Sequence, residues 1–459
     1  MSPKGRPEGE SVPKRVSAEG SPVSPAHPER YDVAVIGAGL AGMSAALFAR
    51  ERGLSCIQVG GSGGILFASG LLDLLGVHPV VERRTWRNPF AALAALAQDE
   101  PDHPLARVDA ASIRAAFASF VAALDTAGLP YAPLGERNRS VLTSMGTIKT
   151  TFGVPRSMAA GAEALDVRSP CLLVDFHGLR EFSARQIVAT LAGSWPGLTH
   201  RRIEFPRSGA AAELYAAHLA RSLETRAVRE QVIGLVRPIV GDAHAVGFPA
   251  VLGLARSADV HAAFEAGLGV PVFEIPTMPT SVPGLRLQGA LESAVAGRGV
   301  RRIRRTEVRG LAFAMNDNDA TLELGDDPNG RGGECVVARA VVLATGRFSG
   351  RGLVADRHGI REPILGLPVA QPPSREDWHR RDFHDPAGHA IHRAGLTVDH
   401  AWRPLDGTGT PAWPRLVAVG SMLAKQDWIR AKCGSGLAIA TAWAAIDHLA
   451  RELRATASG

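Results

Sequence analysis

Cysteine is scarce in this sequence, which limits the kinds of site that the chain could build. The 459 residues include only four cysteines, which are Cys56, Cys171, Cys335 and Cys433. No two of them have the C-x-x-C spacing, which argues against a zinc or iron–sulfur site made by this chain alone, and we predict no metal site. Without a disulfide framework, a reducing cytoplasm is the expected compartment.

Aromatic residues and long apolar runs are also few. Aromatic residues make up 5% of the chain, and the formal net charge of +6 comes from basic residues that are scattered rather than clustered. Nucleic-acid binding favours a basic stripe with aromatic platforms, so we predict no nucleic-acid partner. No stretch approaches the roughly 20 apolar residues of a membrane-spanning helix, so we also predict no direct membrane span.

The most informative stretch runs from Tyr31 to Gly60 and has the pattern of a strand, a glycine turn, a helix and a second strand. Residues 37–42 read G-A-G-L-A-G, which matches the G-x-G-x-x-G fingerprint. Gly37 would make the tight turn, Gly39 would let the backbone approach a phosphate, and Gly42 would let the helix pack on the strand. The helix would point its first amide groups at that phosphate. The predicted cofactor-binding residues here are Gly37, Ala38, Gly39, Leu40 and Gly42.

One part of a dinucleotide site is missing at the end of the second strand. Residues 57–61 read I-Q-V-G-G, with no Asp or Glu to hydrogen-bond an adenosine ribose. Gln58 could bind a ribose, although less strongly than an anion would. The residues expected to bind the phosphate are all present, whereas those expected to bind the adenosine are few. The sequence therefore favours FMN and leaves FAD as the alternative.

Three later segments have the pattern of flavin-contacting turns. Ile65 to Leu75 is expected to form a short apolar helix, whose Ser69 and Gly70 could lie against the flavin; a helix that only packs locally is the alternative. An apolar strand ends in Thr345 and Gly346. A last strand ends in Gly420, and a final helix opens with Gly434, Ser435 and Gly436.

Strand–helix repeats between residues 171 and 275 predict a second α/β layer. The expected fold is therefore α/β: a Rossmann-type FAD/NAD(P)-binding flavoprotein fold with an inserted second α/β region. We predict a disordered tail at 1–29, rich in Pro, Ser and Gly and unlike a signal peptide. The flavin-binding domain would occupy 30–100, the insertion 101–299, and the return to the flavin-binding domain 300–459.

Four stretches carry a more specific resemblance. They are FASGLLDLL at 67–75, PTMPTSVPGLRLQ at 276–288, VVLATGRFSGRGLVADRHGIREPILGLPV at 341–369 and VGSMLAKQDWIRAKCGSG at 419–436. In these stretches the chain resembles the B subunit, a flavoprotein subunit, of the anaerobic glycerol-3-phosphate dehydrogenase of bacteria. The resemblance extends from about residue 31 to the end.

The resemblance implies a part in oxidising sn-glycerol 3-phosphate to dihydroxyacetone phosphate, with electrons passed to a quinone. In that family, one partner carries the FAD-dependent dehydrogenase chemistry, another carries the iron–sulfur clusters and the membrane attachment, and the B subunit is assigned FMN. The implied location is cytoplasmic, peripheral at the inner face of the cell membrane through a partner subunit. The sequence identifies no catalytic residue.

Five basic residues lie near the late glycine turns in the sequence and could balance flavin or phosphate charge; they are Arg347, Arg351, Arg361, Lys425 and Lys432. Two other functions remain open at this point. One is a self-contained FAD-dependent oxidoreductase of fumarate-reductase-like type. The other is a non-catalytic structural subunit with a vestigial nucleotide site.

Overall fold

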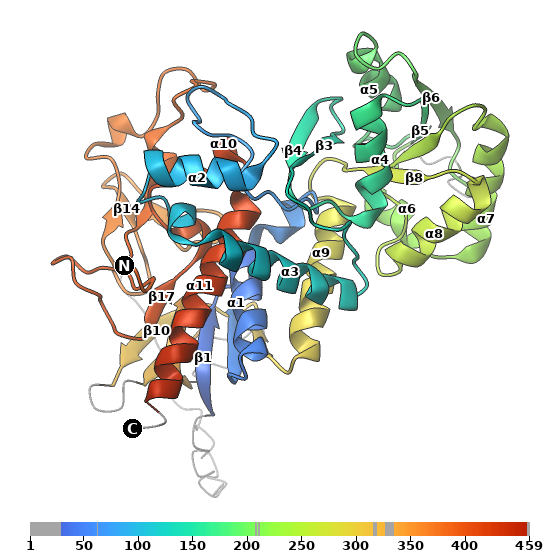
Figure 1. Ribbon diagram of the computed structural model, residues 1–459. Coiled ribbons are helices and arrows are strands. Elements are labelled where there is room, and N and C mark those ends of the chain that lie inside the picture. Colours follow the sequence, from blue (N-terminus) through green and yellow to red (C-terminus); the bar gives the residue numbers. More distant parts are fainter. Residues whose placement is uncertain are drawn as a thin grey trace, which may run out of the picture.

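A computed structural model describes residues 29–61, 63–206, 209, 212–314, 319–325 and 335–456. Residues 1–28 of the predicted tail lie outside the described part. Two parallel-rich sheets organise the chain (Figure 1). Each sheet has its own hydrophobic core, so the chain has two bodies, which we call the first and second body.

The first body is organised around a sheet in the order β10-β11-β12-β1-β2-β9, with β17 also paired to β12. Strands β1, β2, β9, β12 and β17 run parallel, while β10 and β11 form an antiparallel extension. The bounds are β1 Arg30–Ile36, β2 Cys56–Gly60, β9 Arg301–Arg304, β10 Val308–Phe313, β11 Ala320–Leu324, β12 Cys335–Leu343 and β17 Leu416–Ala418. The central β1 is apolar and buried at its carboxyl end, as expected for a strand covered on both faces.

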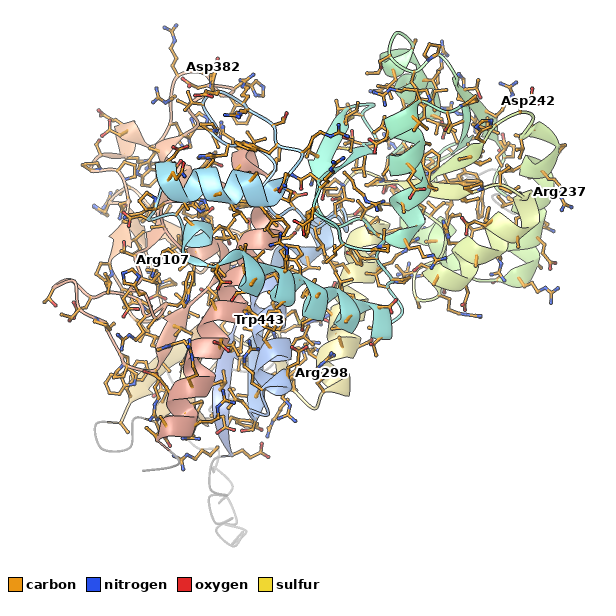
Figure 2. The ribbon with its side chains drawn as sticks, in the orientation of Figure 1. Arg107, Arg237, Asp242, Arg298, Asp382 and Trp443 are labelled. Atoms are coloured by element: carbon orange, nitrogen blue, oxygen red, sulfur yellow. The ribbon has the colours of Figure 1, made fainter. Side chains whose placement is uncertain are left out.

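Helices α1 and α11 pack against each other beside this sheet, and α3 and α9 pack with them (Figure 1). Trp443 of α11, labelled in Figure 2, meets Phe48 of α1 edge to face at 4.9 Å and lies under Arg52. The bounds are α1 Leu40–Glu51, α2 Pro89–Asp99, α3 Ala110–Thr126, α9 Val282–Gly297, α10 Trp428–Ala431 and α11 Gly434–Ala455. Helices α3 and α9 therefore share the first core, although both fall in the segment predicted as the insertion; the domain boundaries stay a prediction.

The second body is a four-stranded parallel sheet in the order β6-β5-β7-β8. Its strands are β5 Cys171–Phe176, β6 Leu198–Ile203, β7 Ala245–Pro249 and β8 Val272–Ile275. Its helices are α4 Arg156–Val167, α5 Ala184–Leu191, α6 Ala216–Leu223, α7 Arg226–Val236 and α8 Ser257–Leu268. Phe273 packs so closely on Gly161 and Gly247 that a Cβ at either glycine would lie within 2.6 Å of its ring. The predicted fold class, with its inserted α/β region, is confirmed.

The hairpin of β3 Arg139–Leu142 and β4 Ile148–Thr151 lies between the two bodies (Figure 1). Just after β4, Gly153 exchanges backbone hydrogen bonds with Leu72 of the first body. Further along, Arg286 of α9 forms a buried ion pair with Glu274 of β8, with Nη1 and Oε2 2.5 Å apart. The first contact ties the hairpin to the segment that follows β2, and the second ties α9 of the first body to β8 of the second body.

Candidate flavin-binding site

The glycine turn lies at the carboxyl end of β1. Gly37 has φ +116°, and a Cβ there would lie 2.2 Å from the carbonyl oxygen of Ala344 at the end of β12. A Cβ at Gly42 would lie 2.0 Å from the carbonyl oxygen of Gly37. Both positions therefore require glycine, because β1, α1 and the end of β12 meet with no room for a side chain.

The N-terminus of α1 has the features of a phosphate cradle. Its N-cap is Gly39, which provides no capping side chain, and the first turn carries no acidic residue. A Cβ at Gly39 would meet nothing within 4 Å. The first amide groups of α1, which begin at Leu40, are thus free for an anion that the helix dipole also favours. The residues present fit the diphosphate or phosphate of a flavin nucleotide.

The two later strand ends come to the same turn. The backbone nitrogen of Ala344 donates to Ile36, and that of Val419 donates to Leu343. A Cβ at Gly420 would lie 2.6 Å from the Cβ of Ala41 in α1. The structure therefore brings together the predicted residues Gly37, Ala38, Gly39, Leu40, Gly42, Thr345, Gly346 and Gly420.

Gln58 lies beneath this turn, and both ends of its side-chain amide already have partners. Its Nε2 donates to the carbonyl oxygen of Gly37, and its Oε1 accepts from Nε of Arg302 in β9 at 3.0 Å. Gln58 is 1% exposed. That it contacts a cofactor stays a prediction, and no sequence pattern indicated its pairing with Arg302.

The end of β2 is close to the glycine turn. Gly60 has φ +134°, and a Cβ there would lie 3.2 Å from the Cα of Gly37. A carboxylate-bearing residue at Gly60 would therefore be strained and crowded. This packing gives a physical reason for the missing ribose-binding acid.

The expected helix over Ile65–Leu75 is wrong. The structure has only a short 3₁₀ helix, η1 Gly63–Phe67, and then an irregular segment with bends at Gly70 and Leu74. Leu72 bonds to Gly153, and the hydroxyl of Tyr131 donates to the carbonyl oxygen of Gly70 at 2.6 Å. These contacts with distant segments outweigh the local helical preference of an apolar run.

Ser69 and Gly70 lie on this irregular segment, which contacts the start of α11 through Asp73. The backbone nitrogen of Gly436 donates to the carbonyl oxygen of Asp73 at 2.6 Å. The N-cap of α11 is Cys433, which makes no side-chain capping bond. The last predicted residues, Gly434, Ser435 and Gly436, thus form the first turn of α11, beside the segment that carries Ser69 and Gly70. No side chain caps this helix end, and the backbone of Asp73 already binds the amide of Gly436.

The five basic residues near the late turns do not form one cluster. Arg351 pairs with Glu307, Arg361 with Asp356, and Lys425 with Asp102, all on the exposed surface. Lys432 is exposed. Arg347 differs, because burial lowers the pKa of its guanidinium and its Nη atoms donate to the carbonyl oxygens of Ile391 and His392.

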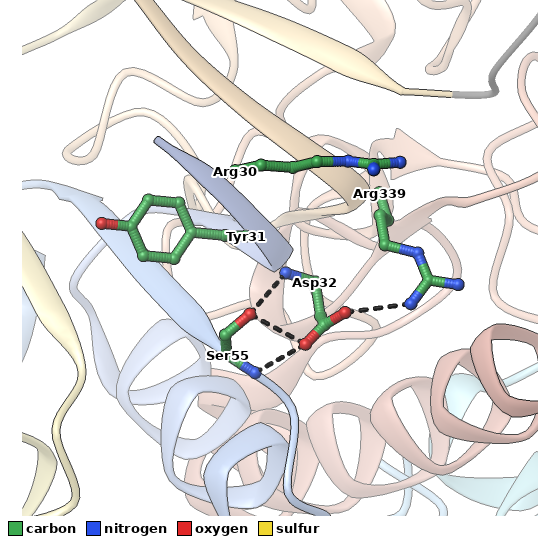
Figure 3. Close-up of a pocket in the computed structure, with 5 residues that line it drawn as sticks. All are labelled: Arg30, Tyr31, Asp32, Ser55 and Arg339. Atoms are coloured by element: carbon green, nitrogen blue, oxygen red, sulfur yellow. Dashed lines mark hydrogen bonds and ion pairs between the residues drawn. The ribbon is translucent and has the colours of Figure 1, made fainter. Parts of the chain in front are cut away.

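A pocket at the opposite end of β1 is lined by Arg30, Tyr31, Asp32, Ser55 and Arg339 (Figure 3). Asp32 accepts hydrogen bonds from the backbone and hydroxyl of Ser55 and pairs with Arg339 at 3.0 Å. Burial would raise the pKa of Asp32, but these bonds outweigh burial and lower it. Ligands of parallel sheets bind at the carboxyl ends of strands, and this pocket lies at the other end of β1 from the predicted flavin site.

Within the described residues, no group of three or more His, Cys, Asp or Glu side chains is placed to hold a metal ion. Among the same residues, no helix is both long enough and apolar enough to cross a membrane.

The fold and the glycine turn define a flavin-binding protein of the Rossmann type. A family model described as FAD binding domain matches residues 32–437. The chain is 31% identical to the B subunit of anaerobic glycerol-3-phosphate dehydrogenase from Vibrio cholerae serotype O1, over 91% of this chain and 96% of that protein. It is 34% identical to the corresponding protein of Halobacterium salinarum, a probable B subunit of the same dehydrogenase, over 90% of this chain and 96% of that protein.

The chain belongs to the family of the anaerobic glycerol-3-phosphate dehydrogenase B subunits, and the resemblance seen in the sequence is confirmed. Among solved structures, the 3-ketosteroid Δ1-dehydrogenase of Sterolibacterium denitrificans matches with 14% identity and a TM-score of 0.40, over 92% of this chain and all of that one.

Proposed function

We propose that this chain is the flavin-carrying subunit of a multi-subunit glycerol-3-phosphate:quinone oxidoreductase. It would transfer electrons between a dehydrogenase subunit, which oxidises sn-glycerol 3-phosphate to dihydroxyacetone phosphate, and an iron–sulfur subunit that reduces a quinone. The observation that carries this proposal is family membership over nine-tenths of the chain. The glycine turn supports it, because Gly37 and Gly42 are packed so closely that only glycine fits, and Gly39 leaves the helix end open to a phosphate.

The residues of the chain have separate parts in this proposal. The amide groups at Gly37–Gly42 would hold the phosphate of the flavin nucleotide. The backbone groups of the turns at Thr345–Gly346 and Gly420 would contact the middle of the cofactor. The first turn of α11, at Gly434–Gly436, would meet the flavin ring beside Ser69 and Gly70. The flavin itself, when bound, supplies the ability to accept and release electrons.

We propose FMN as the cofactor, with FAD as the alternative. The adenosine of FAD would need a polar side chain to bind its ribose at the end of β2. At that position the chain has Gly60, which packs on the glycine turn. The amide of Gln58 is engaged by Gly37 and Arg302. FMN needs no such grip, because its single phosphate would lie on the helix end.

We propose two partners from the same complex, a FAD-dependent dehydrogenase subunit and an iron–sulfur subunit that anchors the assembly to the membrane. The chain would then be cytoplasmic and peripheral at the inner face of the cell membrane, held there by the iron–sulfur partner. The similarity over nearly the full length of the bacterial and archaeal B subunits supports this arrangement, because their names place them in a multi-subunit dehydrogenase.

The test is to purify the full chain, record its absorption spectrum, and identify by mass spectrometry the cofactor that heat releases. We expect flavin absorption and FMN. Release of FAD would overturn the FMN assignment, and a chain that stays colourless after reconstitution would overturn the flavin-subunit proposal. Turnover of glycerol 3-phosphate with an artificial acceptor by the isolated chain would instead favour a self-contained enzyme.

A further inference from the structure

An ion pair lies beside the first turn of α11, and it joins the first body to the hairpin between the two bodies. Oδ2 of Asp73 is 2.9 Å from Nζ of Lys149, and the side chains are 15% and 27% exposed. Asp73 belongs to the segment after β2, and Lys149 belongs to β4 in the hairpin between the bodies. The sequence shows both residues but no pattern that would pair them.

The backbone fixes the position of this ion pair. The carbonyl oxygen of Asp73 accepts from Gly436 in the first turn of α11. On the other side, Leu72 exchanges hydrogen bonds with Gly153, just beyond β4. The hairpin therefore places Lys149 close to the first turn of α11.

Two oxygen atoms near this pair lack partners. Oδ1 of Asp73 is buried and accepts no hydrogen bond from any described residue. Two positions beyond Lys149 on β4, Thr151 is 1% exposed, and its Oγ1 likewise has no partner among the described residues. The protein itself covers Oδ1 of Asp73, so among the described residues Lys149 is the group that balances the charge of this carboxylate.

We infer that the Asp73–Lys149 ion pair sets the electrostatic potential at the ring end of the flavin, and so tunes how readily the bound flavin is reduced. This inference rests on the proposed function, in which the ring lies at the start of α11. Oδ1 of Asp73 is covered by the protein, so both residues act on the flavin through their charge, and Lys149 also holds the carboxylate in place. The hairpin between the bodies would thereby influence the redox centre held by the first body.

The physical basis is the charge that reduction adds to the flavin. An unpaired carboxylate nearby opposes that added charge, and an unpaired ammonium favours it. Because both side chains are mostly shielded from water, salt screens them less than it screens surface charges. Removing one partner should therefore shift the midpoint potential in a direction set by the charge left behind.

The experiment measures the midpoint potential of the flavin bound to the full chain, by equilibration with redox dyes. We expect K149Q to lower the potential and D73N to raise it, with the double variant returning towards the wild type. The matched control is K425Q, which breaks another lysine–aspartate pair, with Asp102 at 2.6 Å, where the two side chains are 46% and 75% exposed. We expect K425Q to shift the potential less than either of the other single changes.

Opposite shifts distinguish a charge effect from damage to the fold, which would move both variants in the same direction. Shifts of the same sign, or shifts no larger than that of K425Q, would overturn this inference while leaving the flavin proposal intact. If one variant does not fold, the sign of the other decides. A wild-type chain that binds no flavin would overturn the proposed function and this inference with it.

Discussion

Replacing Arg286 by Met should destabilise the protein by about 3–5 kcal/mol, because it leaves a carboxylate buried without its cation. Glu274 has no exposed side-chain surface, and Arg286 is the partner of both of its oxygens. Met has a similar volume and cannot donate a hydrogen bond. Urea denaturation followed by circular dichroism measures the change in the free energy of unfolding.

The pH dependence of this effect follows from the charge of Glu274. Burial would raise the pKa of this carboxyl, but the charge and hydrogen bonds of Arg286 outweigh burial and lower it. A lowered pKa in the folded state means that the pair stabilises the protein above the ordinary pKa of glutamate and loses this contribution as the pH falls. The stability difference between R286M and the wild type should therefore narrow at acidic pH.

The control is R256M, in the exposed pair of Arg256 with Asp259, whose side chains are both 64% exposed. Exposed pairs contribute about 0–1 kcal/mol, so this change should have little effect. An R286M protein as stable as R256M at neutral pH would show that the buried pair does not hold α9 to the second body.

The sequence was sufficient for the parts of the site whose geometry is local. The spacing of Gly37, Gly39 and Gly42 follows from one turn between one strand and one helix, so a six-residue pattern predicts where each lies. The strand ends at Gly346 and Gly420 were also recognisable, because apolar strands of a parallel sheet end at the same edge. Their contact with the turn needed no further information than the fold class.

The predictions that were wrong or missing concern residues whose partners lie far away in the sequence. The segment after β2 has the composition of a helix, but its pairing with Gly153 through Leu72 replaces the hydrogen bonds of a helix. The partner of Gln58 is Arg302, contributed by a strand that follows the whole second body. The same holds for Lys149 and Asp73. Local propensity cannot predict such contacts, because they arise only when segments far apart in the sequence pack together.

The glycine turn also permits a test that separates binding from folding. Replacing Gly39 by Val should leave the protein folded and abolish flavin retention. The φ of Gly39 is −76°, which suits an ordinary residue, and a Cβ there would meet no protein atom within 4 Å. The added side chain would instead fill the space that the phosphate must enter, so cofactor loss should exceed tenfold by absorbance after gel filtration, an order-of-magnitude figure for losing a close backbone–phosphate approach.

Two further glycine variants serve as comparisons for the G39V result. G42V should fail to fold, because its Cβ would lie 2.0 Å from the carbonyl oxygen of Gly37. G289V, in α9, is the matched control, because its Cβ also meets nothing within 4 Å and lies in another element. It should keep both fold and flavin. If G39V kept its full flavin content while folded, the phosphate would have to bind elsewhere. Loss of flavin from G289V as well would show that the assay reports general damage rather than a blocked cradle.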